Sequence, residues 1–176
     1  MPQIMSGDDV ARAIRRIAHE IIERHRGASA VGLIGIRTRG VHLARDLASS
    51  IEEFEGLSVP LGELDVRGHR DDVDRQFTPS DVATSIPFDL DGRPVVVVDD
   101  VLYTGRTVRA ALDAISEIGR ADKIELAVLI DRGHRELPVR ADYVGKNVPT
   151  ASRERIAVHV PAVDGDSGVW IEKGAD

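Results

Sequence analysis

The sequence predicts an α/β fold, in which a mostly parallel, twisted sheet is flanked by helices. Continuous apolar runs at 31–36, 95–98 and 124–130 are typical of strands that are buried on both faces. Helical patterns follow the first two of these runs, and each run ends in polar residues. Strands that alternate with helices form parallel sheets covered by helices on both sides.

Length and composition favour one domain that spans residues 1–176. The chain has 176 residues, of which 42% are hydrophobic, and this is enough to form one main core. No apolar run approaches the roughly 18 residues that a membrane span needs. The first residues lack a basic-then-apolar signal pattern, so we expect a cytoplasmic location without membrane contact.

Cysteine content and net charge exclude some classes of site. The chain has no cysteine, which rules out disulfides, thiolate metal sites and a cysteine nucleophile. Its formal net charge of −7 argues against strong non-specific binding of nucleic acids. A net charge can nevertheless conceal a local basic face.

The first predicted element is a helix at 10–22. Its apolar positions recur at helical spacing, and Asp8 and Asp9 lie where acidic side chains favour a helix N-terminus. The opposite face is basic, and only Glu23 interrupts it. This face is either a solvated outer surface or part of a binding surface; its basic residues are Arg12, Arg15, Arg16, His19 and Arg26.

The next elements are a strand at 31–36, a basic turn at 37–40 and a helix that starts near Val41. Gly56 lies where a glycine ends a helix. A further strand is predicted at 57–66. The polar stretch 67–81 has no periodicity and is too long for an ordinary connection, which is typical of functional or disordered loops.

The second half of the chain continues the alternation. Asp91-Gly92 predicts a turn before the strand at 95–98. A helical pattern opens at Val108 and is closed by Gly119, and the strand at 124–130 follows. The tail at 142–171 reads as short strands with turns at Pro149 and Gly165.

The ends of the strands predict one crevice. In parallel sheets, ligands bind beyond the carboxyl ends of the strands. The segments 37–40, 99–107 and 131–137 all follow such ends, so these sequence-distant loops should meet there.

The segment 99–107 carries the most specific chemistry. Thr104-Gly105-Arg106-Thr107 precedes a helix, and its amide groups, together with the helix dipole, make an anion site. Asp99 and Asp100 repel each other, and a cation or hydroxyl donors such as a ribose diol would relieve that repulsion. The Walker A and Rossmann patterns are absent.

Residues 95–107 resemble the phosphoribosyl-diphosphate signature of type I phosphoribosyltransferases, which is an apolar strand, two acids and Thr-Gly-x-Thr. The resemblance narrows to the pyrimidine-operon attenuation regulators. It rests on Arg16–Glu20, Gly35–Gly40, Asp99–Ala110 and Asp131–Thr150, and it extends from the first helix to about residue 155. It implies a type I phosphoribosyltransferase-like fold with a small hood and a flexible lid loop.

This resemblance implies two activities. The first is RNA-binding control of pyrimidine genes, and the second is a uracil phosphoribosyltransferase that converts uracil and 5-phosphoribosyl diphosphate to UMP and pyrophosphate. It implies that Asp99, Asp100 and Arg39 are catalytic, with Mg²⁺ bound through the substrate and not by direct protein ligands. Arg37, Thr38 and Arg39 would grip the pyrophosphate, as guanidinium groups suit phosphate oxygens, and the 5′-phosphate would lie on Tyr103, Thr104, Gly105, Arg106 and Thr107.

The lid and the reading of the base are also implied. The stretch 67–81 is the candidate lid, in which Arg67, Arg70 and Arg75 would reach the phosphates. The family usually has an aliphatic-aromatic pair before Arg70-Asp71-Asp72, whereas this chain has Gly68-His69. Uracil would be read by the segment 131–137, with Asp131 and His134 as contacts, although His134 also fits a plain surface residue.

For RNA, the resemblance implies contacts to an mRNA leader under the control of UMP or UTP, with a homodimer or higher oligomer as the assembly. The residues are Arg15, Arg16, His19, Arg135, Arg140 and Lys146. An alternative is an RNA-binding regulator whose crevice senses nucleotides but catalyses weakly. A purine or orotate transferase is disfavoured, because Asp131–Thr150 resembles none of those enzymes.

Overall fold

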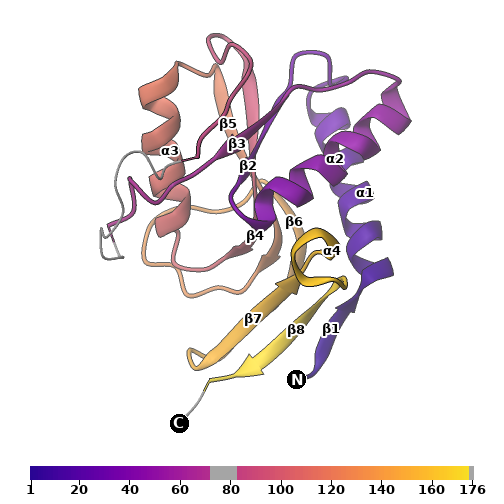
Figure 1. Ribbon diagram of the computed structural model, residues 1–176, viewed down its shortest axis with the longest axis vertical. Coiled ribbons are helices and arrows are strands. Elements are labelled where there is room, and N and C mark those ends of the chain that lie inside the picture. The colour runs from indigo at the N-terminus through magenta and orange to yellow at the C-terminus, as the bar shows by residue number, and fades with distance from the viewer. Residues whose placement is uncertain (72–82, 175–176) are drawn as a thin grey trace.

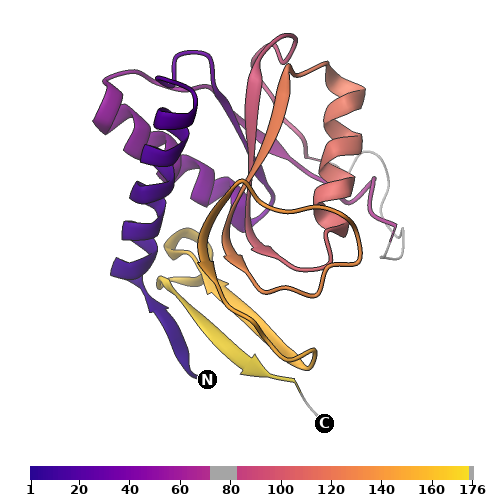
Figure 2. The ribbon, with the colours of Figure 1, turned by 180° about the vertical axis from the view of Figure 1, so that it is seen from behind.

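A computed structural model describes residues 1–71 and 83–174. Five parallel strands form the main sheet in the order β3-β2-β4-β5-β6. They are β2 (Gly32–Ile36), β3 (Leu61–Leu64), β4 (Pro94–Leu102), β5 (Lys123–Asp131) and β6 (Tyr143–Asn147). Helices α1 (Gly7–Arg24) and α2 (Arg39–Glu55) cover one face, and α3 (Arg106–Ile118) covers the other (Figures 1 and 2). The predicted fold class is confirmed.

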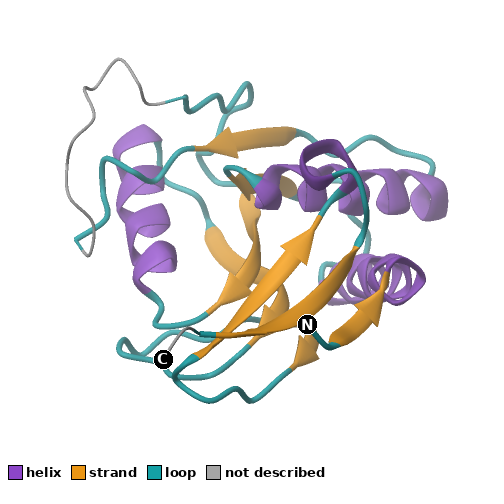
Figure 3. Cartoon of the chain, turned by 60° about the horizontal axis from the view of Figure 1, so that its bottom comes forward, coloured by secondary structure: helices purple, strands orange, loops and turns teal. Residues whose placement is uncertain are grey.

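A second, smaller sheet lies at one end of the molecule (Figure 3). It is antiparallel, in the order β1-β8-β7, and joins β1 (Gln3–Ser6), β7 (Glu154–His159) and β8 (Gly168–Lys173). The short helix α4 (Pro161–Asp164) connects β7 to β8. We call β1, β7, α4 and β8 the hood, which agrees with the small hood that the resemblance implied.

The valine run in β4 explains why the sheet is covered on both faces. Because successive side chains of a strand point to opposite sides, Val96 and Val98 pack with α1 and α2, while Val95 and Val97 pack with α3. All four valines are at most 2% exposed. A strand that is apolar on both faces needs helices on both sides of the sheet.

The helix ends follow local chemistry. Ser6 caps α1 through a reciprocal pair, in which the Asp9 amide donates to Ser6 Oγ (3.2 Å) and the Ser6 amide donates to Asp9 Oδ2 (2.8 Å). Gly56 ends α2 with a φ of 70°, as its position predicted. Within the described part of the chain, no helix combines the length and apolar character needed to cross a bilayer.

The bounds of two predicted elements were wrong. The strand expected at 57–66 is confined to Leu61–Leu64, because Pro60 precedes it and the chain turns at Asp65 to make side-chain hydrogen bonds. The helix expected from Val108 begins at Arg106, directly after Gly105. The sequence analysis also missed α4 and β1, and β1 depends on pairing with the distant β8.

A buried polar cluster ties α1 to the edge of the main sheet. The Glu125 side chain is 1% exposed and accepts hydrogen bonds from Arg24 (3.0 Å) and Tyr143 (2.9 Å), and it contacts His25 Nε2 at 2.5 Å. Burial raises the pKa of Glu125, but the hydrogen bonds from Arg24, His25 and Tyr143 outweigh it, so that the pKa lies below its ordinary value of 4.5.

Replacing Glu125 by Gln or Ala should therefore destabilise the fold by about 3 kcal/mol at pH 7, because it breaks a buried ionic network. Since the folded-state pKa of Glu125 is depressed, its stabilisation is complete above pH 4.5 and is lost as the pH falls through the folded-state value. Urea unfolding at pH 7 and at acidic pH should show the gap between wild type and Glu125→Gln closing with acid. The exposed Glu23→Gln is the control, and a constant gap would contradict this account.

Candidate active site

A cavity of 510 Å³ opens at the carboxyl ends of β2, β3 and β4. Three segments of the chain form its walls: the turn after β2, the stretch after β3, and the end of β4 with the start of α3. Its lining comprises Ile36, Arg37, Thr38, Arg39, Asp65, Val66, Arg67, Arg70, Asp99, Asp100, Val101 and Thr107. Two of the three loops predicted to converge therefore do so.

Asp99 and Asp100 both line this cavity, near the end of β4. Asp99 is 9% exposed and Asp100 is half-buried. Burial and the negative charge of Asp100 raise the pKa of Asp99 well above its usual range, and the charge of Arg70 opposes this rise. The pair is thus an excess of negative charge at the border of an open cavity, where a cation or hydroxyl donors are favoured.

The backbone holds the pair in place. The Asp100 amide donates to Asp99 Oδ1 (2.9 Å), and the Val101 amide donates to Asp100 Oδ1 (2.8 Å). These two bonds fix the orientation of both carboxylates at the cavity.

The turn 103–107 connects this pair to α3. Gly105 has a φ of 97° and precedes the helix, so the first amide groups of α3 lie at the cavity edge, where Thr107 lines it. The Arg106 amide faces Thr104 Oγ1 (3.4 Å), while its guanidinium binds Glu136 (3.0 Å) and Asp71 (2.9 Å). The side chain of Arg106 therefore connects the loops that carry Asp71 and Glu136, and its backbone belongs to the turn.

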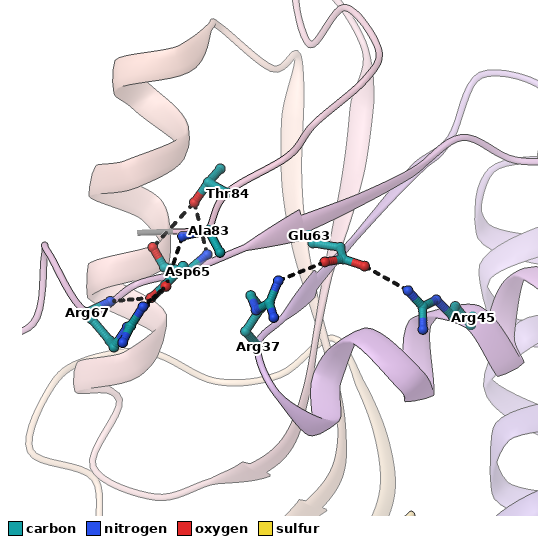
Figure 4. Close-up of polar contacts among 7 residues, drawn as sticks. All are labelled: Arg37, Arg45, Glu63, Asp65, Arg67, Ala83 and Thr84. Carbon is teal, nitrogen blue, oxygen red and sulfur yellow. Dashed lines mark hydrogen bonds and ion pairs between the residues drawn. The ribbon is translucent and has the colours of Figure 1, made fainter. Parts of the chain in front are cut away.

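The turn after β2 supplies the cations. Arg37 donates to Glu63 Oε2 (3.1 Å), and Glu63 also binds Arg45 (2.7 Å), as Figure 4 shows. The peptide bond between Arg37 and Thr38 is cis. Arg39 forms two hydrogen bonds to Asp164 of the hood, and Asp100 acts on it through its charge.

Asp65 is a site residue that the sequence analysis missed. It is 5% exposed and accepts hydrogen bonds from the Arg67 guanidinium (2.6 Å) and from the amide of Ala83 (3.1 Å), while its own amide donates to Thr84 Oγ1 (3.0 Å) (Figure 4). Burial raises the pKa of Asp65, but these hydrogen bonds outweigh it and hold the pKa below its usual value. Asp65 therefore joins the segments on either side of 72–82, and the Asp-x-Arg spacing after a strand was its sequence signal.

The predicted lid at 67–81 is described only up to Asp71, and Arg75 lies outside the described residues. Arg67 and Arg70 line the cavity, as expected. Asp71 binds Arg106 and Arg109 of α3, at 2.9 and 2.8 Å. His69 pairs with Glu117 near the end of the same helix (2.9 Å). The beginning of the stretch is thus held against α3.

The third predicted loop, 131–137, packs against the turn and does not line the main cavity. The Arg132 amide donates to the Leu102 carbonyl (3.1 Å), and the Arg132 guanidinium lies 3.9 Å from the centre of the Tyr103 ring. Tyr103 and Arg132 line a second cavity of 570 Å³, together with residues 152–155 and 172–174 of the hood side. Arg132, which is 6% exposed, lies within the segment expected to read uracil, although it was not named there as a contact.

The other members of this loop have internal partners. Asp131 binds Arg135 (2.5 Å) and accepts the Gly133 amide (3.0 Å). His134 has a φ of 66° and contacts the Thr150 carbonyl through Nε2 (2.5 Å). Arg135 also donates to the carbonyls of Tyr103 and Val139, so its guanidinium shapes the loop.

The predicted RNA-binding residues divide into groups. Arg16 of α1 donates to the carbonyls of Val144 and Gly145 in β6 (3.0 and 2.6 Å), so it lies next to exposed Lys146. Arg15 and His19 face α2: Arg15 binds Glu53 (2.8 Å), and the His19 ring stacks on Phe54 at 3.9 Å. Arg140 is exposed on the loop before β6. α1 and β6 together therefore form one basic surface, from which Arg135 is separate.

Comparison with known proteins decides the family. A model described as "Phosphoribosyl transferase domain" matches residues 3–162, which is most of the chain. The chain belongs to the phosphoribosyl transferase domain family. The enzyme class predicted from the sequence is thereby confirmed.

Among its relatives are several called "Bifunctional protein PyrR". The one from Roseiflexus sp. (strain RS-1) is 59% identical over 171 residues, covering 96% of this chain and 93% of the relative. Those from Pelotomaculum thermopropionicum and Thermus aquaticus are 55% and 53% identical and cover at least 97% of each chain. The resemblance to the bifunctional pyrimidine regulators is thus confirmed over nearly the whole length.

Solved phosphoribosyltransferase structures share the fold. A hypoxanthine phosphoribosyltransferase of Trypanosoma cruzi aligns with a TM-score of 0.72 over 99% of this chain and 98% of its own, at 17% identity. At this identity the similarity concerns the fold alone.

The turn of this phosphoribosyltransferase offers a direct test, because Gly105 meets two constraints at once. Its φ is positive, and a Cβ atom would lie 2.4 Å from Val139 Cγ2. Gly105→Ala should destabilise the fold by about 2–3 kcal/mol, of which the left-handed backbone accounts for about 1.

Gly92→Ala is the matched control, since Gly92 has a φ of 69° and open space around it. It should cost only the backbone part, and Val139→Ala should reduce the cost of Gly105→Ala. Urea unfolding of the three single variants and of the Gly105→Ala/Val139→Ala double variant measures both effects. Equal costs for the two glycine substitutions would contradict the role of Val139.

Proposed function

We propose that this chain is a uridine-nucleotide-responsive, RNA-binding regulator of pyrimidine genes that also converts uracil and 5-phosphoribosyl diphosphate to UMP and pyrophosphate. One observation carries the catalytic part. Two adjacent carboxylates and four arginines line the same cavity, and Thr107, in the first turn of α3, lines its edge. The whole chain, 1–176, acts as a single domain in this proposal.

The cavity matches the groups of a phosphorylated, activated ribose. Asp100, which is the more accessible acid, binds the ribose hydroxyls together with Asp99. The 5′-phosphate lies on the amides of 103–107, where the helix dipole favours an anion. Arg37, Thr38, Arg39 and Arg70 line the side of the cavity that receives the diphosphate.

Catalysis then depends on position and charge. Breaking the bond between C1 and the diphosphate leaves positive charge on the ribose and negative charge on the leaving group. The arginines stabilise the leaving group, while the carboxylates beside the ribose favour its positive charge. No side chain needs to act as a nucleophile, because uracil attacks C1 from a position that the site fixes.

Mg²⁺ fits this site, because Asp99 and Asp100 concentrate negative charge beside the expected diphosphate. Asp100 would hold the ion through water, and most of its ligands would be substrate oxygens. When bound, the ion neutralises charge on the leaving group.

Uracil belongs next to the ribose, and the second cavity supplies a suitable surface. Tyr103 and Arg132 form a cation–π pair at its edge, against which a planar base can stack. Loop 131–137, which includes Asp131 and His134, lies behind this pair and offers backbone groups to the oxygens and N3–H of the base.

Purified protein with Mg²⁺, uracil and 5-phosphoribosyl diphosphate should form UMP, measured by chromatography. Asp100→Asn should lower kcat/KM by about 100-fold, because it removes charge stabilisation at the reacting ribose. The fold should persist, since the amide oxygen can still accept the Val101 amide.

Asp113→Asn, an exposed acid on α3, is the control and should leave the rate unchanged. A wild-type protein that binds UMP without forming it would instead favour the alternative, a regulator with a nucleotide-sensing crevice.

The regulatory part concerns the basic surface of α1 and β6. Arg16 donates to the carbonyls of Val144 and Gly145, just before Lys146 in the chain. Arg15 and His19 extend the surface toward α2, and Arg140 precedes β6. Such a surface binds phosphates of an mRNA leader, and a homodimer or higher oligomer would extend it. The His19 ring and the Arg15 guanidinium both pack on Phe54, so the aromatic ring positions these two basic side chains.

Binding of a pyrimidine-operon leader RNA should weaken as salt rises, with a linear relation between log K and log salt concentration. Lys146→Gln should reduce the slope by about 1, because one phosphate contact is lost. Arg120→Gln, at the other end of the sheet, is the control.

Fluorescence anisotropy of the labelled RNA, with and without UMP, measures the salt dependence of binding and the change in slope caused by Lys146→Gln. A flat salt dependence would end the RNA proposal without touching the catalytic one.

A further inference from the structure

One ion pair connects the pyrophosphate side of the cavity to the hood. Arg39 Nη2 lies 2.7 Å from Asp164 Oδ1, and Arg39 Nε lies 3.2 Å from Asp164 Oδ2. The two residues are 125 positions apart in the sequence. The Asp164 side chain is 15% exposed and that of Arg39 is 36% exposed, so the pair is largely withdrawn from water.

Asp164 is itself held firmly. Its Oδ2 accepts the Val160 amide (2.8 Å), and the Gly165 amide donates to the Pro161 carbonyl (3.1 Å), which closes α4. The next acid in the chain, Asp166, binds His159 Nδ1 (2.8 Å) and does not contribute to the Arg39 pair. The carboxylate of Asp164 is therefore fixed in position, and the long, flexible side chain of Arg39 donates to it.

The geometry leaves the useful side of the guanidinium available. A guanidinium has five N–H donors in a planar fork, and Asp164 occupies one on Nε and one on Nη2. The end of the fork, formed by Nη1 and the second hydrogen of Nη2, stays outside this pair. Arg39 lines the cavity, and the charge of Asp100 acts on it there.

We propose that Asp164 is a positioning residue for phosphoribosyl transfer, which holds Arg39 side-on so that the end of its guanidinium binds the diphosphate. This rests on the proposed role of Arg39 as a diphosphate ligand. Arg39 would otherwise lose rotamer freedom when the substrate binds, and Asp164 removes that cost in advance. The hood thereby acts on the substrate without touching it.

A purely structural tie between the hood and the main sheet makes a different prediction. It would change the melting temperature but not the preference for one substrate. If Asp164 positions Arg39, its removal must instead weaken the binding of 5-phosphoribosyl diphosphate and of pyrophosphate. The KM for uracil must stay the same.

The experiment compares Asp164→Ala, Asp164→Asn and Asp164→Glu with wild type in steady-state UMP synthesis, and pyrophosphate binding is measured by calorimetry. We expect Asp164→Ala to raise KM for 5-phosphoribosyl diphosphate about tenfold and to weaken pyrophosphate binding by a similar factor, as expected for a lost bidentate partner. KM for uracil should stay within about twofold in this account. Asp164→Asn should show a smaller loss, and Asp164→Glu should restore part of it.

Asp166→Asn is the matched control, because it alters the same loop without reaching Arg39. It should leave both KM values unchanged. If Asp164→Ala fails to fold, Asp164→Asn, which is nearly isosteric, carries the test.

An unchanged KM for 5-phosphoribosyl diphosphate in a folded Asp164 variant would overturn the inference. Tighter binding of this substrate would also overturn it, because it would mean that Asp164 competes with the substrate for Arg39. In either case UMP synthesis by the wild type leaves the proposed function standing. Arg39→Ala, run in parallel, tests the assignment of Arg39 separately, and an unchanged KM there would overturn both the assignment and the inference.

Discussion

Asp99 and Asp100 lie close together near the end of a central strand with a buried apolar run, and the surrounding site compensates for their charge. A strand whose other residues pack into two cores cannot turn these acids away to bulk water. Arg70 and Arg39 therefore act on them electrostatically across the cavity, and the backbone fixes their orientation. The same close placement that raises the pKa of Asp99 suits a ribose with a developing positive charge.

Much of the fold could be predicted because it follows from local sequence patterns, such as apolar runs and glycines at helix ends. The valine run in β4, the apolar run in β5 and the glycines after α2 and α3 gave strands and helices at nearly the right positions. The convergence of the turn after β2 with the end of β4 followed from parallel topology alone. These inferences need only periodicity and the direction of the strands.

The missed features depend on contacts between distant segments. β1 exists as a strand because β8 pairs with it, and Asp164 gains its role from a partner that no spacing reveals. The Asp-x-Arg spacing was a signal for Asp65, but its contacts with Ala83 and Thr84 lie beyond that motif. Basic residues show the same limit. Arg135 donates to Tyr103, Val139 and Asp131, whereas Arg16 donates to Glu20 and to the β6 backbone just before Lys146. The net charge of −7 could not reveal this division.

The pairing of β1 with β8 has a consequence for biosynthesis. β1 precedes every strand of the main sheet in the chain, whereas its partner β8 follows all of them. During translation the main sheet can therefore assemble before β8 has been made, whereas the small sheet must wait for β8. A protein released prematurely would keep its two acids and its phosphate turn but lack the carboxylate that faces Arg39, so truncated chains would be poor competitors for the activated sugar.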